Sequence, residues 1–242
     1  MGRGIAELRI PVSECSSSLV ADVAGSETGA SPCAPTDAAV GGRLTVGLLA
    51  VQGDFGLHRH AVETLGHKTA PVRVAADLEG LDCLIMPGGE STTMRKLMQM
   101  DGLFAALPEF ARSKPIMGTC AGLILLGRRI VGAPEEPTLG LIDCDVDRNA
   151  YGSQYHSFRQ AGRAHLGNGA CLLEMVFIRA PRLVRVGDGV DVLGWLDDEP
   201  TLVRQGNILA MTFHPELAGG ASVHHFFLTQ MVAARSDQSP AG

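Results

Sequence analysis

The sequence lacks the features that mark several common functional classes. It contains no run of Lys or Arg, and its 242 residues carry a net charge of −6, so neither a nucleic acid nor an anionic membrane is expected as a main partner. No apolar stretch approaches the roughly 18 residues of a membrane span. Aromatic residues make up only 5%, whereas 45% hydrophobic residues and 30 glycines suit a soluble α/β protein with many strand-to-helix turns.

Cysteine pairing motifs and nucleotide-binding loops are also absent. None of the six cysteines belongs to a C-x-x-C pair, and no Cys/His spacing would close a zinc site, so we expect free thiols in a reducing compartment and no metal. The sequence has no Gly-rich loop of the P-loop or dinucleotide type and no evident Schiff-base lysine, so no cofactor is expected. These absences predict a soluble, cytoplasmic protein. The cysteines are Cys15, Cys33, Cys83, Cys120, Cys144 and Cys171.

Composition divides the chain into three parts. Residues 1–42 are rich in Ser, Ala, Gly and Thr and lack both the basic and the apolar regions of a secretory signal, so they are predicted to be a flexible N-terminal extension. Residues 43–235 are predicted to form one domain. Residues 236–242 are predicted to be a disordered tail.

Within the domain, strand-like and helix-like segments alternate, which predicts a mainly parallel sheet with helices on both faces. Ser91 is the expected N-cap of a helix that carries Met94, Leu97 and Met98 on one face. In such folds the active site lies at the carboxyl ends of the strands. Further predicted helices are 58–65 and 103–110, and the predicted strands are 44–51, 72–75, 83–86, the run from Pro115 to Cys120, and 208–213.

Cys120 ends one of these strands, and a helix-like run follows it at once. Gly118 and Gly122 would let the backbone turn tightly around Cys120, as in the nucleophile elbow of G-x-S-x-G enzymes. A helix N-terminus favours the thiolate, which is the reactive form of cysteine. The alternative is a buried structural cysteine.

His214 and Glu216 follow another strand and are separated by one proline. Pro215 favours an extended His214, so the histidine and the glutamate can project to the same side. A histidine oriented by a carboxylate is a general base, and near Cys120 it could accept the thiol proton and return a proton to a leaving amine. The alternative is a histidine that only caps backbone groups at the strand end.

Five segments together resemble a known family, the class I (triad) glutamine amidotransferases, and within it the glutaminase subunits of pyridoxal 5′-phosphate synthase. The resemblance extends from about Leu44 to Ala234. It implies the fold of that class, an α/β three-layer sandwich with a mainly parallel central sheet of flavodoxin-like type. The segments are Pro87–Met94, Gly118–Ile124, Arg148-Asn149 with Tyr151-Gly152 and Gln154, Phe177–Pro181, and Phe213–Leu217.

This resemblance implies hydrolysis of L-glutamine to L-glutamate and ammonia through a thioester on Cys120, with His214 and Glu216 completing the triad. The backbone N–H groups of Gly89 and Ala121 are suited to stabilising the oxyanion. An arginine is suited to the α-carboxylate of glutamine, because a planar guanidinium can bind it in bidentate fashion. The substrate-binding residues implied by the resemblance are Gly89, Glu90, Ser91, Arg148, Ile178 and Arg179.

The resemblance also implies a partner, a barrel-shaped pyridoxal 5′-phosphate synthase subunit in a hetero-oligomeric complex that receives the ammonia through a channel. Gln52-Gly53 matches a family segment close to that interface. Pyridoxal phosphate is then the product of the complex and no cofactor of this chain, and glutaminase activity without the partner is expected to be weak. Two alternatives are the glutaminase subunit of another amidotransferase, such as imidazole glycerol phosphate synthase, and a non-catalytic glutaminase-like binding module.

Overall fold

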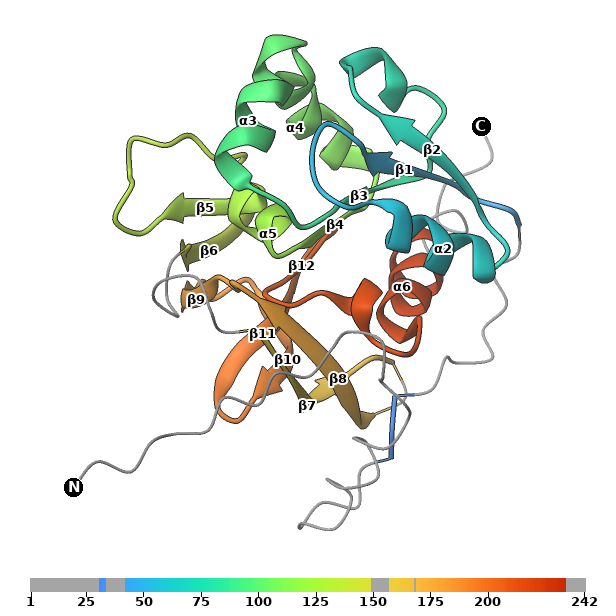
Figure 1. Ribbon diagram of the computed structural model, residues 1–242, viewed down its shortest axis with the longest axis vertical. Helices are drawn as coiled ribbons and strands as arrows, with labels where there is room; N and C mark the ends of the chain where they lie inside the picture. Colours follow the sequence, from blue (N-terminus) through green and yellow to red (C-terminus); the bar gives the residue numbers. More distant parts are fainter. Residues whose placement is uncertain (1–30, 34–41, 149–156, 168, 234–242) are drawn as a thin grey trace, which may run out of the picture.

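The structure is a computed structural model that describes residues 31–33, 42–148, 157–167 and 169–233 (Figure 1). Asn149, Tyr151, Gly152, Gln154 and the predicted tail 236–242 lie outside the described residues. The helices are α2 (Gly56–Thr64), η1 (Ala75–Leu78), α3 (Ser91–Met100), α4 (Leu103–Ser113), α5 (Ala121–Leu126), η2 (Pro215–Leu217), α6 (Ser222–Phe226) and η3 (Phe227–Ala233). The strands are β1 (Thr45–Leu49), β2 (Lys68–Val72), β3 (Cys83–Met86), β4 (Ile116–Thr119), β5 (Gly127–Ile130), β6 (Ile142–Asp147), β7 (Ser157–His165), β8 (Ala170–Ile178), β9 (Arg182–Val186), β10 (Asp191–Leu196), β11 (Glu199–Gln205) and β12 (Ile208–Met211).

A nine-stranded sheet with the order β2-β1-β3-β4-β12-β11-β10-β7-β8 forms the centre of the domain. The five strands from β2 to β12 are parallel. From β12 to β8, each strand is antiparallel to the next one in this order. The sheet is therefore mixed, whereas the sequence predicted a mainly parallel one. The parallel half is the part in which β3, β4 and β12 lie side by side with their carboxyl ends together.

Helices cover both faces of this sheet, so the predicted three-layer arrangement is present (Figure 1). Side chains alternate along β3: Leu84 and Met86 join the core under α3, α4 and α5, whereas Cys83 and Ile85 join the core under α2, α6 and η3. Both faces of the strand are buried, which explains its continuous apolar sequence. Within the described ranges, no helix is long and apolar enough to cross a bilayer.

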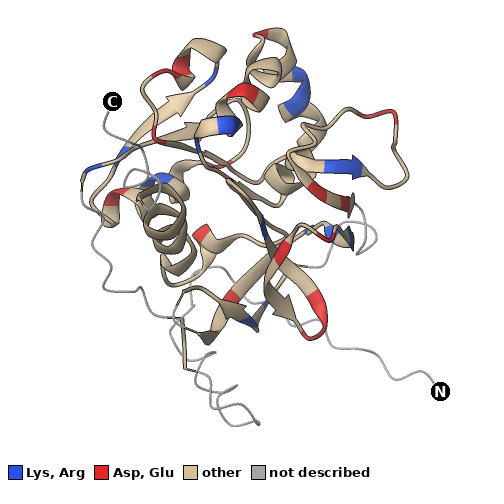
Figure 2. Ribbon diagram, turned by 180° about the vertical axis from the view of Figure 1, so that it is seen from behind, with Lys and Arg blue, Asp and Glu red and all other residues tan. Residues whose placement is uncertain are grey.

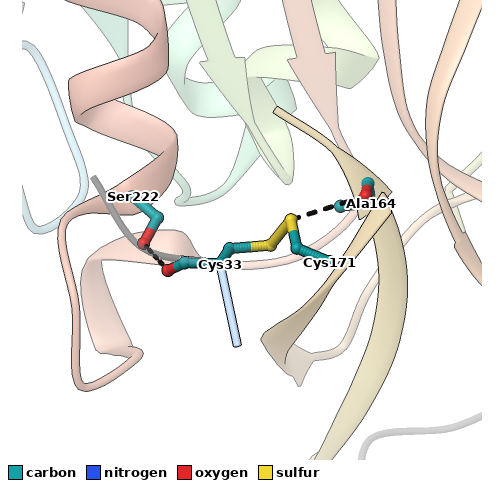
Figure 3. Close-up of a disulfide and its surroundings, with 4 residues drawn as sticks. All are labelled: Cys33, Ala164, Cys171 and Ser222. Atoms are coloured by element: carbon teal, nitrogen blue, oxygen red, sulfur yellow. Dashed lines mark hydrogen bonds between the residues drawn. A yellow bond between two sulfur atoms is a disulfide. The ribbon is translucent and has the colours of Figure 1, made fainter. Parts of the chain in front are cut away.

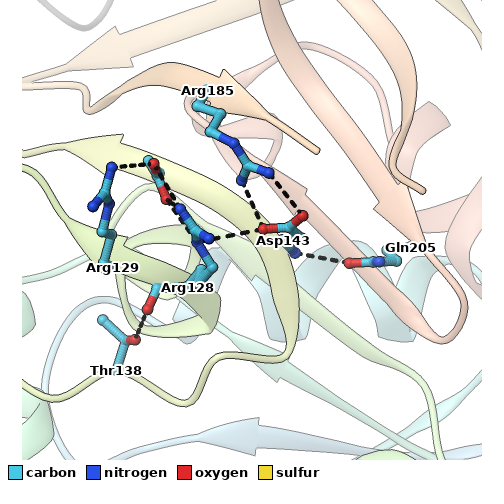
Figure 4. A network of polar contacts seen from close by, with 7 residues as sticks. Arg128, Arg129, Thr138, Asp143, Arg185 and Gln205 are labelled. Atoms are coloured by element: carbon cyan, nitrogen blue, oxygen red, sulfur yellow. Dashed lines mark hydrogen bonds and ion pairs between the residues drawn. The ribbon is translucent and has the colours of Figure 1, made fainter. Parts of the chain in front are cut away.

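A small sheet with the order β5-β6-β9 packs beside the main sheet and is held by ion pairs (Figure 4). Arg185 binds Asp143 through two hydrogen bonds of 2.7 and 3.1 Å, and Arg128 binds the almost fully buried Asp145 through bonds of 3.0 and 3.1 Å. The backbone N–H of Asp143 donates to Oε1 of Gln205 at 2.7 Å, which links the small sheet to β11. Basic and acidic residues are both scattered over the described part of the molecule (Figure 2).

Cys33 and Cys171 form a disulfide, so the prediction of six free thiols is wrong (Figure 3). The two cysteines are 138 residues apart in sequence, and no local spacing motif identifies such a pair. Backbone pairing brings them together: Cys33 N–H donates to the carbonyl of Leu172 at 2.9 Å, and Leu172 N–H donates to the carbonyl of Ser31 at 3.0 Å. Residues 31–33 of the predicted flexible extension therefore lie against β8, and Cys83, Cys120 and Cys144 are free.

Two local predictions are displaced in the structure. The strand predicted at 72–75 is β2 at Lys68–Val72, and Ala75 begins η1. β2 is an edge strand that is buried only at Val72 and begins with Lys68 and Thr69, so it contains no continuous apolar run. The N-cap of α3 is Glu90 and not Ser91, because the Glu90 carboxylate accepts hydrogen bonds from the N–H groups of Thr92 and Thr93 in the first turn.

Candidate active site

The carboxyl ends of β3, β4 and β12 surround a cavity of about 630 Å³. In a parallel sheet these ends lie at one edge, so three segments distant in the sequence meet there. Of the predicted site residues, only Ala121 does not line the cavity; it follows Cys120 as the first residue of α5 and is buried. The predicted residues that line it are Gly89, Glu90, Ser91, Cys120, Arg148, Ile178, Arg179, His214 and Glu216.

Cys120 lies in a sharp turn between β4 and α5. Its backbone has φ 49° and ψ −100°, a sparsely populated conformation for a residue with a side chain. Close packing enforces the turn, because a Cβ at Gly122 would lie 2.3 Å from the carbonyl oxygen of Met86. The Cys120 N–H is held by the carbonyl of Met211 on β12 at 2.9 Å. Cys120 is 7% exposed and lines the cavity, and its Sγ lies 3.9 Å from the carbonyl oxygen of Ile178.

His214 leaves the end of β12 and is fixed at both its backbone and its ring. Its N–H donates to the carbonyl of Val176 on β8 at 2.8 Å, and its Nδ1 lies 2.7 Å from Oε1 of Glu216. Burial would lower the pKa of His214, but hydrogen bonding and charge interaction with Cys120 and Glu216 outweigh burial and raise it to about 10. The imidazole is therefore protonated at neutral pH and can donate a proton beside the sulfur.

The carboxylate and the backbone N–H of Glu90 are both hydrogen-bonded to other groups of the protein. Its carboxylate caps α3, and its N–H donates to Oε1 of Gln52 at 2.8 Å. Burial would raise the pKa of Glu90, but the hydrogen bonds from Thr92 and Thr93 lower it to about 2. A ligand in the cavity would therefore meet a carboxylate that already accepts hydrogen bonds from the first turn of α3.

Arg148 reaches the cavity but already has a carboxylate partner. Its Nη1 and Nη2 each lie 2.9 Å from an oxygen of Glu136, and Nη1 also donates to Oγ1 of Thr92 at 3.1 Å. Hydrogen bonds from Arg148 and Arg95 lower the pKa of Glu136 to about 2. Arg179 also lines the cavity, and its backbone has a positive φ of 45°.

Two buried histidines next to the triad were missed by sequence reasoning. His58 on α2 lies 3.3 Å from Oε2 of Glu216, and its Nδ1 lies 2.9 Å from Nε2 of His224 on α6. Both side chains have no exposed surface. The i, i+4 spacing of His58 and Val62 was the available signal, since Val62 marks the buried face of α2. Throughout the described ranges, no group of three or more His, Cys, Asp or Glu side chains could hold a metal ion.

Known proteins match this chain over most of its length. The SNO glutamine amidotransferase family matches residues 48–233. The chain is 47% identical over 188 residues to the pyridoxal 5′-phosphate synthase subunit PdxT of Thermus thermophilus, covering 77% of this chain and 97% of that protein. It is also 47% identical over 195 residues to PdxT of Corynebacterium jeikeium, covering 79% and 98%.

Solved structures share the fold. A crystal structure described as a glutamine amidotransferase matches with a TM-score of 0.72 and 45% identity, covering 78% of this chain and 98% of that one. PurLQS of Thermotoga maritima matches with a TM-score of 0.60 at 18% identity, covering 80% and 99%, which shows the fold alone. The family match and the extent of identity show that this chain is a member of the SNO glutamine amidotransferase family.

Proposed function

We propose that this chain is the glutaminase subunit of a pyridoxal 5′-phosphate synthase and hydrolyses L-glutamine to L-glutamate and ammonia. The observation that carries the proposal is the meeting of Cys120, His214 and Glu216 at one end of the sheet, in a chain 47% identical to subunits of that synthase. Its fold is the α/β three-layer fold of glutamine amidotransferases.

In the proposed reaction, the Cys120 thiolate attacks the carbon of the side-chain carboxamide and forms a tetrahedral oxyanion. The N–H groups of Gly89 and Ala121 stabilise that oxyanion. His214, protonated at neutral pH, donates its proton to the departing nitrogen, and ammonia leaves. The thioester is then cleaved by water, which His214 deprotonates, releasing glutamate and restoring the thiolate–imidazolium pair.

Glu216 holds His214 in one orientation and stabilises its positive charge through the 2.7 Å contact at Nδ1. The amino-acid end of glutamine is bound by Gly89, Glu90 and Ser91, which follow β3. Ile178 and Arg179, at the end of β8, also bind it. Arg148 binds the α-carboxylate while it keeps its bond to Glu136, so the substrate joins an existing ionic cluster.

Ammonia then passes to a barrel-shaped synthase subunit in a hetero-oligomeric complex, located in the cytoplasm. The relatives' description as synthase subunits supports a partner of this kind. Coupled hydrolysis avoids wasting glutamine, so the free chain is expected to be a weak glutaminase.

The decisive experiment is glutamate production by the purified chain with and without the cognate synthase subunit. We expect the partner to increase kcat, Cys120→Ala to abolish glutamate release in its presence, and Cys144→Ala to retain activity as a thiol control, since Cys144 lies on β6 and does not line the cavity. Glutamate release by the Cys120→Ala variant would contradict the assignment of the triad. Equal turnover with and without the synthase would remove the coupling.

A further inference from the structure

The second oxygen of Glu216 is an unusual feature of the site. Oε1 binds His214, but Oε2 is buried and has no partner of full hydrogen-bond geometry among the described residues. The Nε2 atom of His58 lies 3.3 Å from Oε2. A buried, ionised oxygen without a nearby donor is costly, so this imidazole is the group that compensates it.

His58 is itself held by a second buried histidine. Its Nδ1 lies 2.9 Å from Nε2 of His224, and the two ring centroids are 5.2 Å apart. Oγ1 of Thr119, the residue before Cys120, lies 3.5 Å from His58 Nε2. A series of polar side chains therefore runs inward from the cavity, across four separate elements. Its members in order are Cys120, His214, Glu216, His58 and His224.

Both inner histidines are neutral. Burial lowers the pKa of His58 more than Glu216 and Asp54 raise it, and the nearby His214 lowers it further. Burial, together with the neighbouring His58, lowers the pKa of His224 to about 3 despite Glu216. Each ring consequently carries one N–H, and the contacts decide which nitrogen holds it.

The carboxylate fixes the tautomers. A lone pair at Nε2 of His58 would face the negative Oε2, so Nε2 carries the proton and Nδ1 is an acceptor. His224 must then donate from Nε2, which leaves its Nδ1 unprotonated, and that atom is without a hydrogen-bond partner among the described residues. The opposite set of tautomers would leave a buried N–H unpaired on His224 and an unfavourable contact at Glu216.

We propose that His58, supported by His224, is a positioning residue that holds Oε2 of Glu216 and so keeps Oε1 directed at His214 during glutamine hydrolysis. This inference rests on the proposed function. A neutral donor is suited to the role, because it fixes the carboxylate without competing with the His214 imidazolium for its charge. Burial would raise the pKa of Glu216, but His58 and His214 lower it, so the carboxylate remains ionised.

The first test compares three variants of the full chain assayed with its synthase subunit. His58→Leu removes the donor, His58→Gln retains an amide N–H near the position of Nε2, and His60→Leu is the matched control, an exposed histidine on the same helix. We expect kcat to fall about 10- to 100-fold in His58→Leu with KM changed less than about twofold. His58→Gln should recover most of kcat, and His60→Leu should match the wild type.

The second test does not depend on glutamine turnover. The rate of Cys120 alkylation by iodoacetamide is followed against pH, with mass spectrometry to identify the modified residue. Burial raises the pKa of the Cys144 thiol to about 11 and raises that of Cys83 as well, so neither competes near neutral pH. In His58→Leu the midpoint should move about one pH unit upward, because a misplaced Glu216 stabilises the thiolate–imidazolium pair less. His58→Gln should restore the midpoint.

The two tests separate failure of the inference from failure of the proposed function. A wild-type chain that releases no glutamate overturns the function, while a shifted alkylation profile in His58→Leu still supports the positioning role. A His58→Leu variant with wild-type kcat and an unchanged profile overturns the inference. Equal losses in His58→Leu and His58→Gln, accompanied by equal falls in Tm, also overturn it and assign His58 to packing alone.

Discussion

Gly88→Ala should lower the activity of the enzyme about 100-fold while leaving the fold intact. A Cβ at Gly88 would lie 2.3 Å from Cε1 of His214 and 3.1 Å from its Nδ1. Ordinary contact begins at 3.4 Å, so the ring must move by about 1 Å. The ring is buried and tied to Glu216, so such a displacement breaks its alignment with Cys120.

The expected loss is about 100-fold in kcat, equivalent to about 2.7 kcal/mol of barrier, because a misplacement of 1 Å has an effect of this size. Backbone strain does not contribute, since the φ of Gly88 lies outside the left-handed region. The assay is glutamate release at saturating glutamine with the synthase partner present, alongside Tm by calorimetry.

Two other glycines calibrate this result. Gly42→Ala is the matched control, because no atom lies within 4 Å of the position that its new methyl group would take. Gly122→Ala places a methyl 2.3 Å from a backbone oxygen that cannot rotate away, so it should lower Tm as well as activity. The reasoning is refuted if Gly88→Ala retains kcat within about twofold of Gly42→Ala, a difference of only ~0.4 kcal/mol.

Three further predictions concern stability and binding. Glu90→Ala should lower the free energy of unfolding by about 1 kcal/mol at pH 7 through loss of the α3 cap. The pKa of Glu90 is about 2 in the folded chain, against an ordinary value of 4.5. The difference in free energy of unfolding between wild type and variant, measured by urea titration, should therefore be full above pH 4.5 and vanish as pH falls through 2. Replacing Cys33 and Cys171 by Ser should lower Tm, with a loop-entropy limit of about 5 kcal/mol for a separation of 138 residues. Dithiothreitol should lower the wild-type Tm similarly and leave the double variant unchanged. Arg148→Met should raise KM for glutamine about tenfold or more with a smaller effect on kcat, as measured by initial rates. Arg148→Lys should not restore KM, because a lysine cannot make the paired contacts of a guanidinium. An unchanged KM would contradict the role of Arg148 in binding the α-carboxylate.

The parts of the fold encoded by short apolar runs were predictable. β3 lies at the predicted Cys83–Met86, since a strand buried on both faces must be continuously apolar. The turn at Cys120 was foreseeable for a similar reason, because glycines on both sides of it leave room for the backbone of β3 and the end of α5.

Features that depend on distant partners were not predictable. The disulfide joins two cysteines through backbone pairing at a sheet edge, which no local pattern encodes. The contact of His58 with Glu216 depends on how α2 packs against η2, so a histidine without a sequence-near partner was given no role. The Arg148–Glu136 pair was missed likewise, because Glu136 precedes β6 in a segment without a recognisable motif.

The pairing of residues 31–33 with β8 has a consequence for how the molecule behaves in concentrated solution. An open terminal strand exposes backbone donors and acceptors that can recruit a strand from another molecule and start edge-to-edge aggregation. Here the backbone groups of Leu172 are already satisfied by Ser31 and Cys33, and the disulfide keeps that short segment in place. The opposite edge strand, β2, carries Lys68 and Pro71, residues that discourage such recruitment. One edge of the nine-stranded sheet is thus covered at Leu172 by a covalently attached segment, and the other edge carries residues that disfavour the addition of a strand.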